Sequence, residues 1–99
     1  MNDTIFEIDG KTVTVNSLCI ENTNDKLTVK MQFVTENDKS YSFTFQNVSK
    51  LNIADICYPF EICGFEVLDF SSRGYQKECR FFVNDYEYGI LSFYCESIE

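Results

Sequence analysis

The chain has 99 residues, of which 44% are hydrophobic and 16% aromatic, with a formal net charge of −8 and no histidine. This length fits a single domain, residues 1–99, that buries a core of its own. The ten Phe and six Tyr exclude a disordered chain. The acidic charge disfavours direct binding to nucleic acid or to an anionic membrane surface, since both require cations. It favours a basic protein partner.

We expect a cytoplasmic protein, because the sequence shows no targeting signal and its cysteines are typical of free thiols. No apolar run approaches the roughly 20 residues that span a bilayer, and the first residues carry acid where a signal peptide carries Lys or Arg. The cysteine count is odd and the cysteines are not clustered, which is typical of free thiols rather than a disulfide framework. These residues are Cys19, Cys57, Cys63, Cys79 and Cys95.

Alternating apolar and polar residues predict strands along most of the chain. Two such runs, residues 4–8 and 11–15, flank Asp9-Gly10, a dipeptide typical of a type I′ hairpin turn. In that hairpin Phe6 faces Val13. A short strand at 18–20 is then expected to end in a polar tip at 21–25.

The next two strands are the clearest in the sequence. Residues 27–33 and 41–45 alternate around a turn at 36–39 and predict an antiparallel hairpin with one dry face. Its core residues, together with Phe93, are expected to be Val29, Met31, Phe43 and Phe45.

The middle of the chain is less regular. Residues 49–56 fit irregular structure or a short helix capped by Ser49, or alternatively a strand edge with Leu51 and Ile53 facing inward. Tyr58-Pro59 interrupts regular structure. Strands are expected at about 60–70, 75–83 and 88–97, with turns at 71–74 and 84–87. The fold class is therefore mainly β, an antiparallel meander of about seven or eight strands forming a small barrel or a two-layer sandwich.

Catalytic chemistry finds little support. Without histidine the commonest general base, nucleophile partner and metal ligand are missing. The cysteines contain no Cys-x-x-Cys pair and the four glycines are isolated. The carboxylate pairs Glu7/Asp9 and Asp85/Glu87 adjoin expected turns, where acids are ordinarily solvated. We predict neither an enzyme nor a cofactor or metal site.

One group of residues suggests binding to another protein. Tyrosine gives a large, stiff contact area with a polar tip, and acids around it complement a basic partner. The expected interface combines the last hairpin with part of the irregular loop before residue 60: Asp85, Tyr86, Glu87, Tyr88, Tyr94, Glu96, Asp55 and Tyr58. A half-exposed hairpin whose tyrosines cover the core is the alternative interpretation.

A family resemblance points the same way. The order Phe45-Gln46-Asn47-Val48-Ser49, Tyr58-Pro59-Phe60 with Gly64-Phe65, Asp85-Tyr86-Glu87 and Phe93-Tyr94-Cys95 resembles small cytoplasmic immunity proteins of bacterial polymorphic toxin systems. The resemblance covers roughly residues 27–98. It implies an inhibitor that occludes a basic toxin domain, with no catalytic residues of its own. The alternatives are a phage-type inhibitor or nucleic-acid mimic, and a small-ligand-binding β-barrel.

Overall fold

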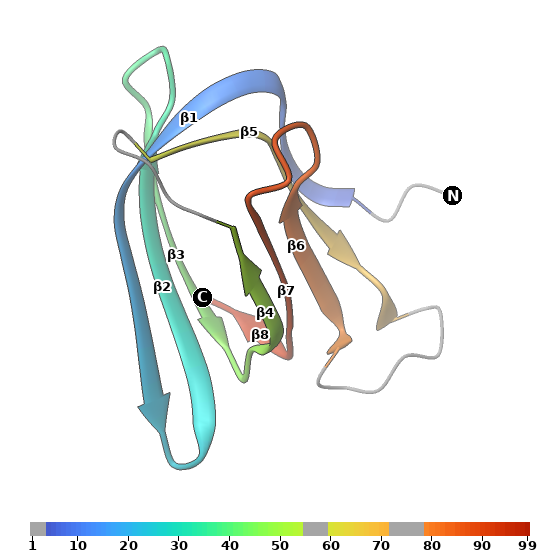
Figure 1. Ribbon diagram of the computed structural model, residues 1–99. Coiled ribbons are helices and arrows are strands. Elements are labelled where there is room, and N and C mark those ends of the chain that lie inside the picture. Colours follow the sequence, from blue (N-terminus) through green and yellow to red (C-terminus); the bar gives the residue numbers. More distant parts are fainter. Residues whose placement is uncertain (1–3, 55–59, 72–78) are drawn as a thin grey trace.

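The computed structural model describes residues 4–54, 60–71 and 79–99, and within them the chain forms one antiparallel sheet of eight strands (Figure 1). The strand order across the sheet is β4-β7-β6-β5-β1-β2-β3-β8. The strands are β1 (Thr4–Thr23), β2 (Lys26–Val34), β3 (Ser40–Gln46), β4 (Ser49–Ile53), β5 (Glu61–Asp69), β6 (Phe81–Asp85), β7 (Leu91–Cys95) and β8 (Ser97–Ile98). The described residues contain no helix long and apolar enough to cross a membrane.

β1 is one strand of 20 residues, so the expected hairpin at Asp9-Gly10 is wrong. Both of its halves pair with β5, and the register shifts between Ile8 and Thr12. The Asp-Gly dipeptide therefore lies in a bulge, where the extra backbone lets a strand bend, and not in a turn. Figure 1 shows β1 bending over the top of the molecule, from the half that contains β6 to the half that contains β2.

Beyond the bend β1 continues into a long arm with β2. Their two-residue loop, Asn24-Asp25, has φ values of 53° and 63° and joins the paired residues Thr23 and Lys26. Positive φ at both loop residues is the geometry of a type I′ turn, which Asn and Asp tolerate. The polar tip expected at 21–25 is thus confirmed for residues 24 and 25, whereas residues 21–23 belong to β1, which is much longer than the strand predicted there.

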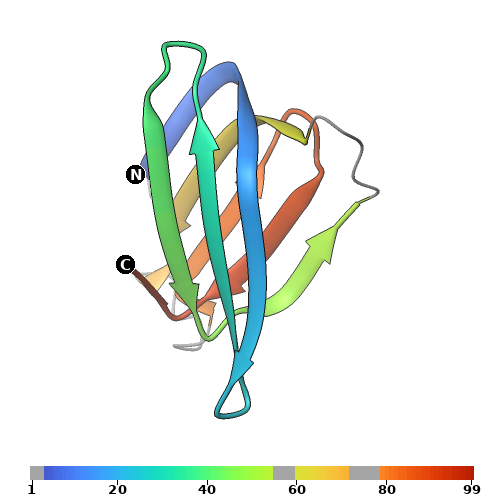
Figure 2. The same ribbon diagram turned by 90° about the vertical axis from the view of Figure 1, so that its left-hand side faces the viewer.

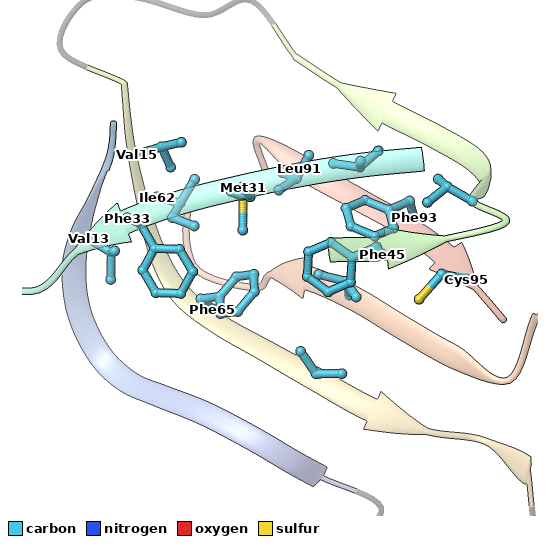
Figure 3. Packing of buried hydrophobic residues seen from close by; sticks show 14 residues of the cluster. Val13, Val15, Met31, Phe33, Phe45, Ile62, Phe65, Leu91, Phe93 and Cys95 are labelled. Carbon is cyan, nitrogen blue, oxygen red and sulfur yellow. The ribbon is translucent and has the colours of Figure 1, made fainter. Parts of the chain in front are cut away.

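The hairpin predicted for residues 27–46 is confirmed as β2 paired with β3. Figures 1 and 2 show the two halves of the sheet facing each other. The inward side chains of the hairpin belong to the hydrophobic core. Phe33, Phe45, Phe65 and Phe93 are fully buried there (Figure 3). The rings of Phe45 and Phe93 meet edge to face at 5.0 Å, which joins β3 to β7. Phe43 is only partly buried and packs against this cluster.

Residues 49–53 form strand β4, so neither a helix nor irregular structure begins at Ser49. Asn47 and Lys50 both have a φ of 54°, and this kinks the chain out of β3 and toward β7. Leu51 and Ile53 pack against the core, as the strand alternative predicted. Pairing with β7 therefore overrides a weak local helix signal; residues 55 and 56 lie outside the described part.

The sheet does not close into a barrel, because β4 and β8 form its two ends. Two pairings nevertheless connect the halves of the sheet. β8, which follows β7 in the chain, pairs with β3 through Phe45 and Ile98 and through Gln46 and Ser97. β4, which follows β3 in the chain, pairs with β7 through Ser49 and Tyr94. The two halves of the sheet are thereby tied along one edge of the molecule.

The turn between β6 and β7 lies later in the chain than expected. β6 extends through Asp85, and β7 does not begin until Leu91, so the turn comprises residues 86–90 instead of 84–87. Leu91, Phe93 and Cys95 share the buried face, as their alternation predicted. The turn expected at 71–74 and most of the strand expected at 75–83 fall on residues outside the described part, apart from Ser71 and residues 79–83.

Candidate interaction surface at the β6–β7 turn

Asp85 holds together both ends of the turn between β6 and β7. Its backbone carbonyl accepts a hydrogen bond from the Gly89 amide at 2.8 Å, and its Oδ1 accepts one from the Leu91 amide, also at 2.8 Å. Gly89 has a φ of +66°, a conformation that favours glycine. The five-residue turn is consequently fixed at its beginning and its end.

Asp85 is completely buried, so the expectation that it is an exposed interface residue is wrong. Its role is to hold the turn together. It lies on the inward face of β6, two residues after Val83. Its Oδ2 has no hydrogen-bond partner among the described residues. Burial raises the pKa of the Asp85 carboxyl, and the hydrogen bonds from Leu91 and Ile90 amides oppose this shift only in part.

The turn rests on β5 at Gly64. The Tyr86 amide donates to the Gly64 carbonyl at 3.1 Å, and the Glu87 amide donates to the Cys63 carbonyl at 3.2 Å. Gly64 has a φ of +73°, and a Cβ placed there would come within 3.0 Å of the Tyr86 ring and of the Glu87 Cγ. Only glycine therefore lets the turn approach the strand this closely.

A thiol lies beneath the turn. The Cys63 Sγ donates a hydrogen bond to the Glu87 Oε2 at 2.9 Å. The pKa of the Cys63 thiol is raised, mainly by this hydrogen bond to the carboxylate and secondly by burial. A nucleophilic cysteine requires the opposite shift, so Cys63 is suited to holding Glu87 in place and not to chemistry.

Aromatic and apolar side chains are exposed around this turn. Tyr86 and Tyr88 are 44% and 52% exposed, and Ile5, on the outer face of β1, is 55% exposed. The Tyr86 hydroxyl donates to the Glu7 Oε2 at 3.3 Å, which links the turn to β1. We call this region the tyrosine–acid surface and define it as Ile5, Glu7, Glu66, Tyr86, Glu87 and Tyr88.

The acids of this surface have no ion-pair partner in the described part of the chain. Glu7 and Glu66 are directly opposite each other on β1 and β5, and both point away from the core. Like charges in that position repel and destabilise a sheet. Within the described part of the chain, Glu7, Glu66 and Glu87 form no ion pair. No group of three or more ligand-type side chains suitable for a metal occurs among the described residues.

The remaining predicted interface residues lie elsewhere. Tyr94 is on the outer face of β7, where the centres of its ring and of the Phe82 ring are 4.8 Å apart. The Lys50 ammonium lies 5.3 Å from the centre of the Tyr94 ring. Glu96 lies between β7 and β8, where its Oε1 accepts a hydrogen bond from Asn47 at 2.8 Å. Asp55 and Tyr58 lie outside the described residues. The structure therefore brings together Tyr86, Glu87 and Tyr88, and separates them from Tyr94 and Glu96.

Three members of the surface were not predicted: Ile5, Glu7 and Glu66. Alternation along residues 4–8 does place Ile5 and Glu7 on one face, opposite Phe6 and Ile8. What the sequence lacks is the pairing of β1 with β5, which connects residues about sixty positions apart.

Comparison of the chain with protein-family models, with curated proteins and with solved structures gives no match.

Proposed function

We propose that this protein is a cytoplasmic inhibitor of the immunity type, which binds a basic protein domain through its tyrosine–acid surface and occludes it. The observation that carries the proposal is the combination of exposed tyrosines with carboxylates that have no cationic partner among the described residues. Tyr86 and Tyr88 offer contact area, while Glu7, Glu66 and Glu87 offer negative charge. Aromatic anchors within a complementary charged rim are typical of protein interfaces.

The rigidity of the turn supports binding. Asp85 fixes both of its ends, and Gly64 and Cys63 hold its middle against β5. A surface that is ordered before binding loses little conformational entropy in the complex, which favours tight association.

The uncompensated acids support a basic partner in particular. A Lys or Arg placed between Glu7 and Glu66 would relieve the repulsion between them. A negative surface also accelerates association with a positive one, and salt reduces this effect. We therefore expect nanomolar or tighter binding with an on-rate that falls as ionic strength rises.

The test begins with capture of the partner from the native host on immobilised protein, followed by binding kinetics across a salt series. Tyr88→Ala is expected to raise the off-rate by about 10- to 100-fold, in line with the loss of an aromatic anchor. Glu7→Gln with Glu66→Gln is expected to slow association several-fold at low salt and to weaken protection of cells that express the partner.

The matched control removes the same two charges elsewhere. Glu36→Gln with Asp38→Asn changes two exposed acids of the β2–β3 turn. If the two double variants slow association equally, net charge and not this surface governs binding. Failure to capture a basic protein, or capture of a partner whose binding none of these variants affects, would refute the proposal. Competition of the complex by nucleic acid would instead indicate a nucleic-acid mimic.

A further inference from the structure

The arm of β1 has an unpaired edge. Pairing of β1 with β5 ends at Thr14, and the last hydrogen bond on that side joins the Val15 amide to the Phe60 carbonyl at 2.9 Å. Residues 16–23 continue as a strand that pairs only with β2, among the residues that the structure describes. Figure 2 shows this part of β1 in front, with β2 along one side.

This edge lacks the usual features that prevent association. An exposed strand edge is commonly blocked by proline, by lysine or by an inward-pointing charge. Residues 16–23 contain no proline and no lysine or arginine. The one charged residue, Glu21, already pairs with Lys30 of β2 at 3.4 Å.

The inward face along the edge is incompletely covered. Ile20 is 46% exposed, although Val29, directly opposite it on β2, is fully buried. Ile20 is therefore exposed because, among the described residues, the sheet has no further strand on that side. Leu18, two residues earlier on the same face, is only partly buried.

We propose that a second copy of this chain pairs with the edge, antiparallel, with Cys19 at the twofold axis. In this register Leu18 faces the partner's Ile20, Asn16 faces the partner's Asn22, and Ser17 faces the partner's Glu21. Directly opposed residues share a face of the sheet, so apolar side chains meet apolar ones and no like charges are opposed. Centring on Leu18 or on Ile20 instead would place an apolar side chain opposite asparagine.

The self-complementarity of this register is the reason for choosing a second copy over an unrelated strand. A twofold interface requires a surface that matches itself, and this one does. Two features make the association weak: the contact is one strand wide, and each copy carries a net charge of −8. Screening of that repulsion strengthens the dimer as salt rises, whereas binding to a basic partner weakens. Because salt acts on them in opposite directions, failure of the dimer proposal can be distinguished from failure of the proposed binding to a basic partner.

The first experiment is sedimentation velocity over a range of protein and salt concentrations. A dimer that increases with protein concentration, and tightens several-fold between low and high salt, supports the proposal. Ile20→Lys puts a charge on the inward face of the edge and is expected to give a monomer with an unchanged thermal melt. A wild-type protein that stays monomeric throughout, or a variant that dimerises as the wild type does, overturns it.

The second experiment reads the register. Cα atoms of opposed residues in antiparallel strands lie about 4.5–5.5 Å apart, within the range that a disulfide bridges. Diamide, which takes up the two thiol hydrogens, is expected to link Cys19 to the partner's Cys19. Cys19→Ser is expected to abolish the link and keep the dimer. Ser17→Cys in that background should not restore it, because the two new thiols would be about 14 Å apart along the strands. Equal linking at both positions contradicts the register.

Discussion

Substitution of Gly64 tests how the β6–β7 turn is held. Gly64→Ala forces an L side chain into a φ of +73° and brings its Cβ within 3.0 Å of the Tyr86 ring and the Glu87 Cγ. The backbone conformation alone costs about 1–2 kcal/mol. Displacement of a packed neighbour adds about 1–3 kcal/mol. We expect a loss of about 2–5 kcal/mol in the free energy of unfolding.

Gly89 provides a matched control, since its φ is +66° and a Cβ there would meet nothing within 4 Å. Gly89→Ala should therefore show the backbone contribution alone, about 1–2 kcal/mol. Denaturant melts of both variants give the difference. Tyr86→Ala removes two of the three close contacts at Gly64, so it is expected to restore about 1 kcal/mol when combined with Gly64→Ala. Equal losses for the two glycine variants, or strict additivity with Tyr86→Ala, would show that the turn does not press on β5.

Three further measurements address the buried groups. Asp85→Asn should leave the Leu91 amide paired while removing a carboxyl whose folded-state pKa is raised above 3.8. A raised pKa favours the protonated form in the folded state, so the wild type should gain stability relative to this variant as pH falls from neutral toward 3.8; a parallel pH dependence of the two melts would contradict this. Burial raises the pKa of Cys95 to about 12, and a thiol reagent should therefore modify exposed Cys19 quickly and reach Cys95 only on unfolding. Phe93→Ala should cost about 3–5 kcal/mol in a denaturant melt, because the ring is fully buried and in contact with Phe45; a loss below about 1 kcal/mol would exclude Phe93 from the core.

Local pattern predicted most of the strands because alternation and turn chemistry are properties of neighbouring residues. The β2–β3 hairpin and its buried face followed directly from alternation. Asp9-Gly10 misled because the same dipeptide suits a hairpin turn and a bulge, and only the pairing with β5 distinguishes them. Ser49 misled in a similar way. Serine is common as a helix cap, but here it is the first residue of β4, which pairs with β7.

The candidate site was less accessible to prediction. The acid–tyrosine pattern identified Tyr86, Glu87 and Tyr88, which share one turn. It could not reveal that Asp85 points inward, because the end of β6 lies two residues later than the turn chemistry indicated. Glu66 joins the surface only through pairing between distant strands, and that pairing has no local signature.

The pairing that ties the two halves of the sheet also has a kinetic consequence. Gln46 and Ser97, which share a hydrogen bond at 2.8 Å, are 51 positions apart in the chain. A contact of this kind closes a long loop, and its entropy must be offset before the contact contributes stability. The arm of β1 and β2 and the following hairpin need only short loops, so they can assemble early. Proteins dominated by distant strand pairs fold in roughly milliseconds to seconds, and this domain is expected to do so, with residues 91–98 joining β3 and β4 late.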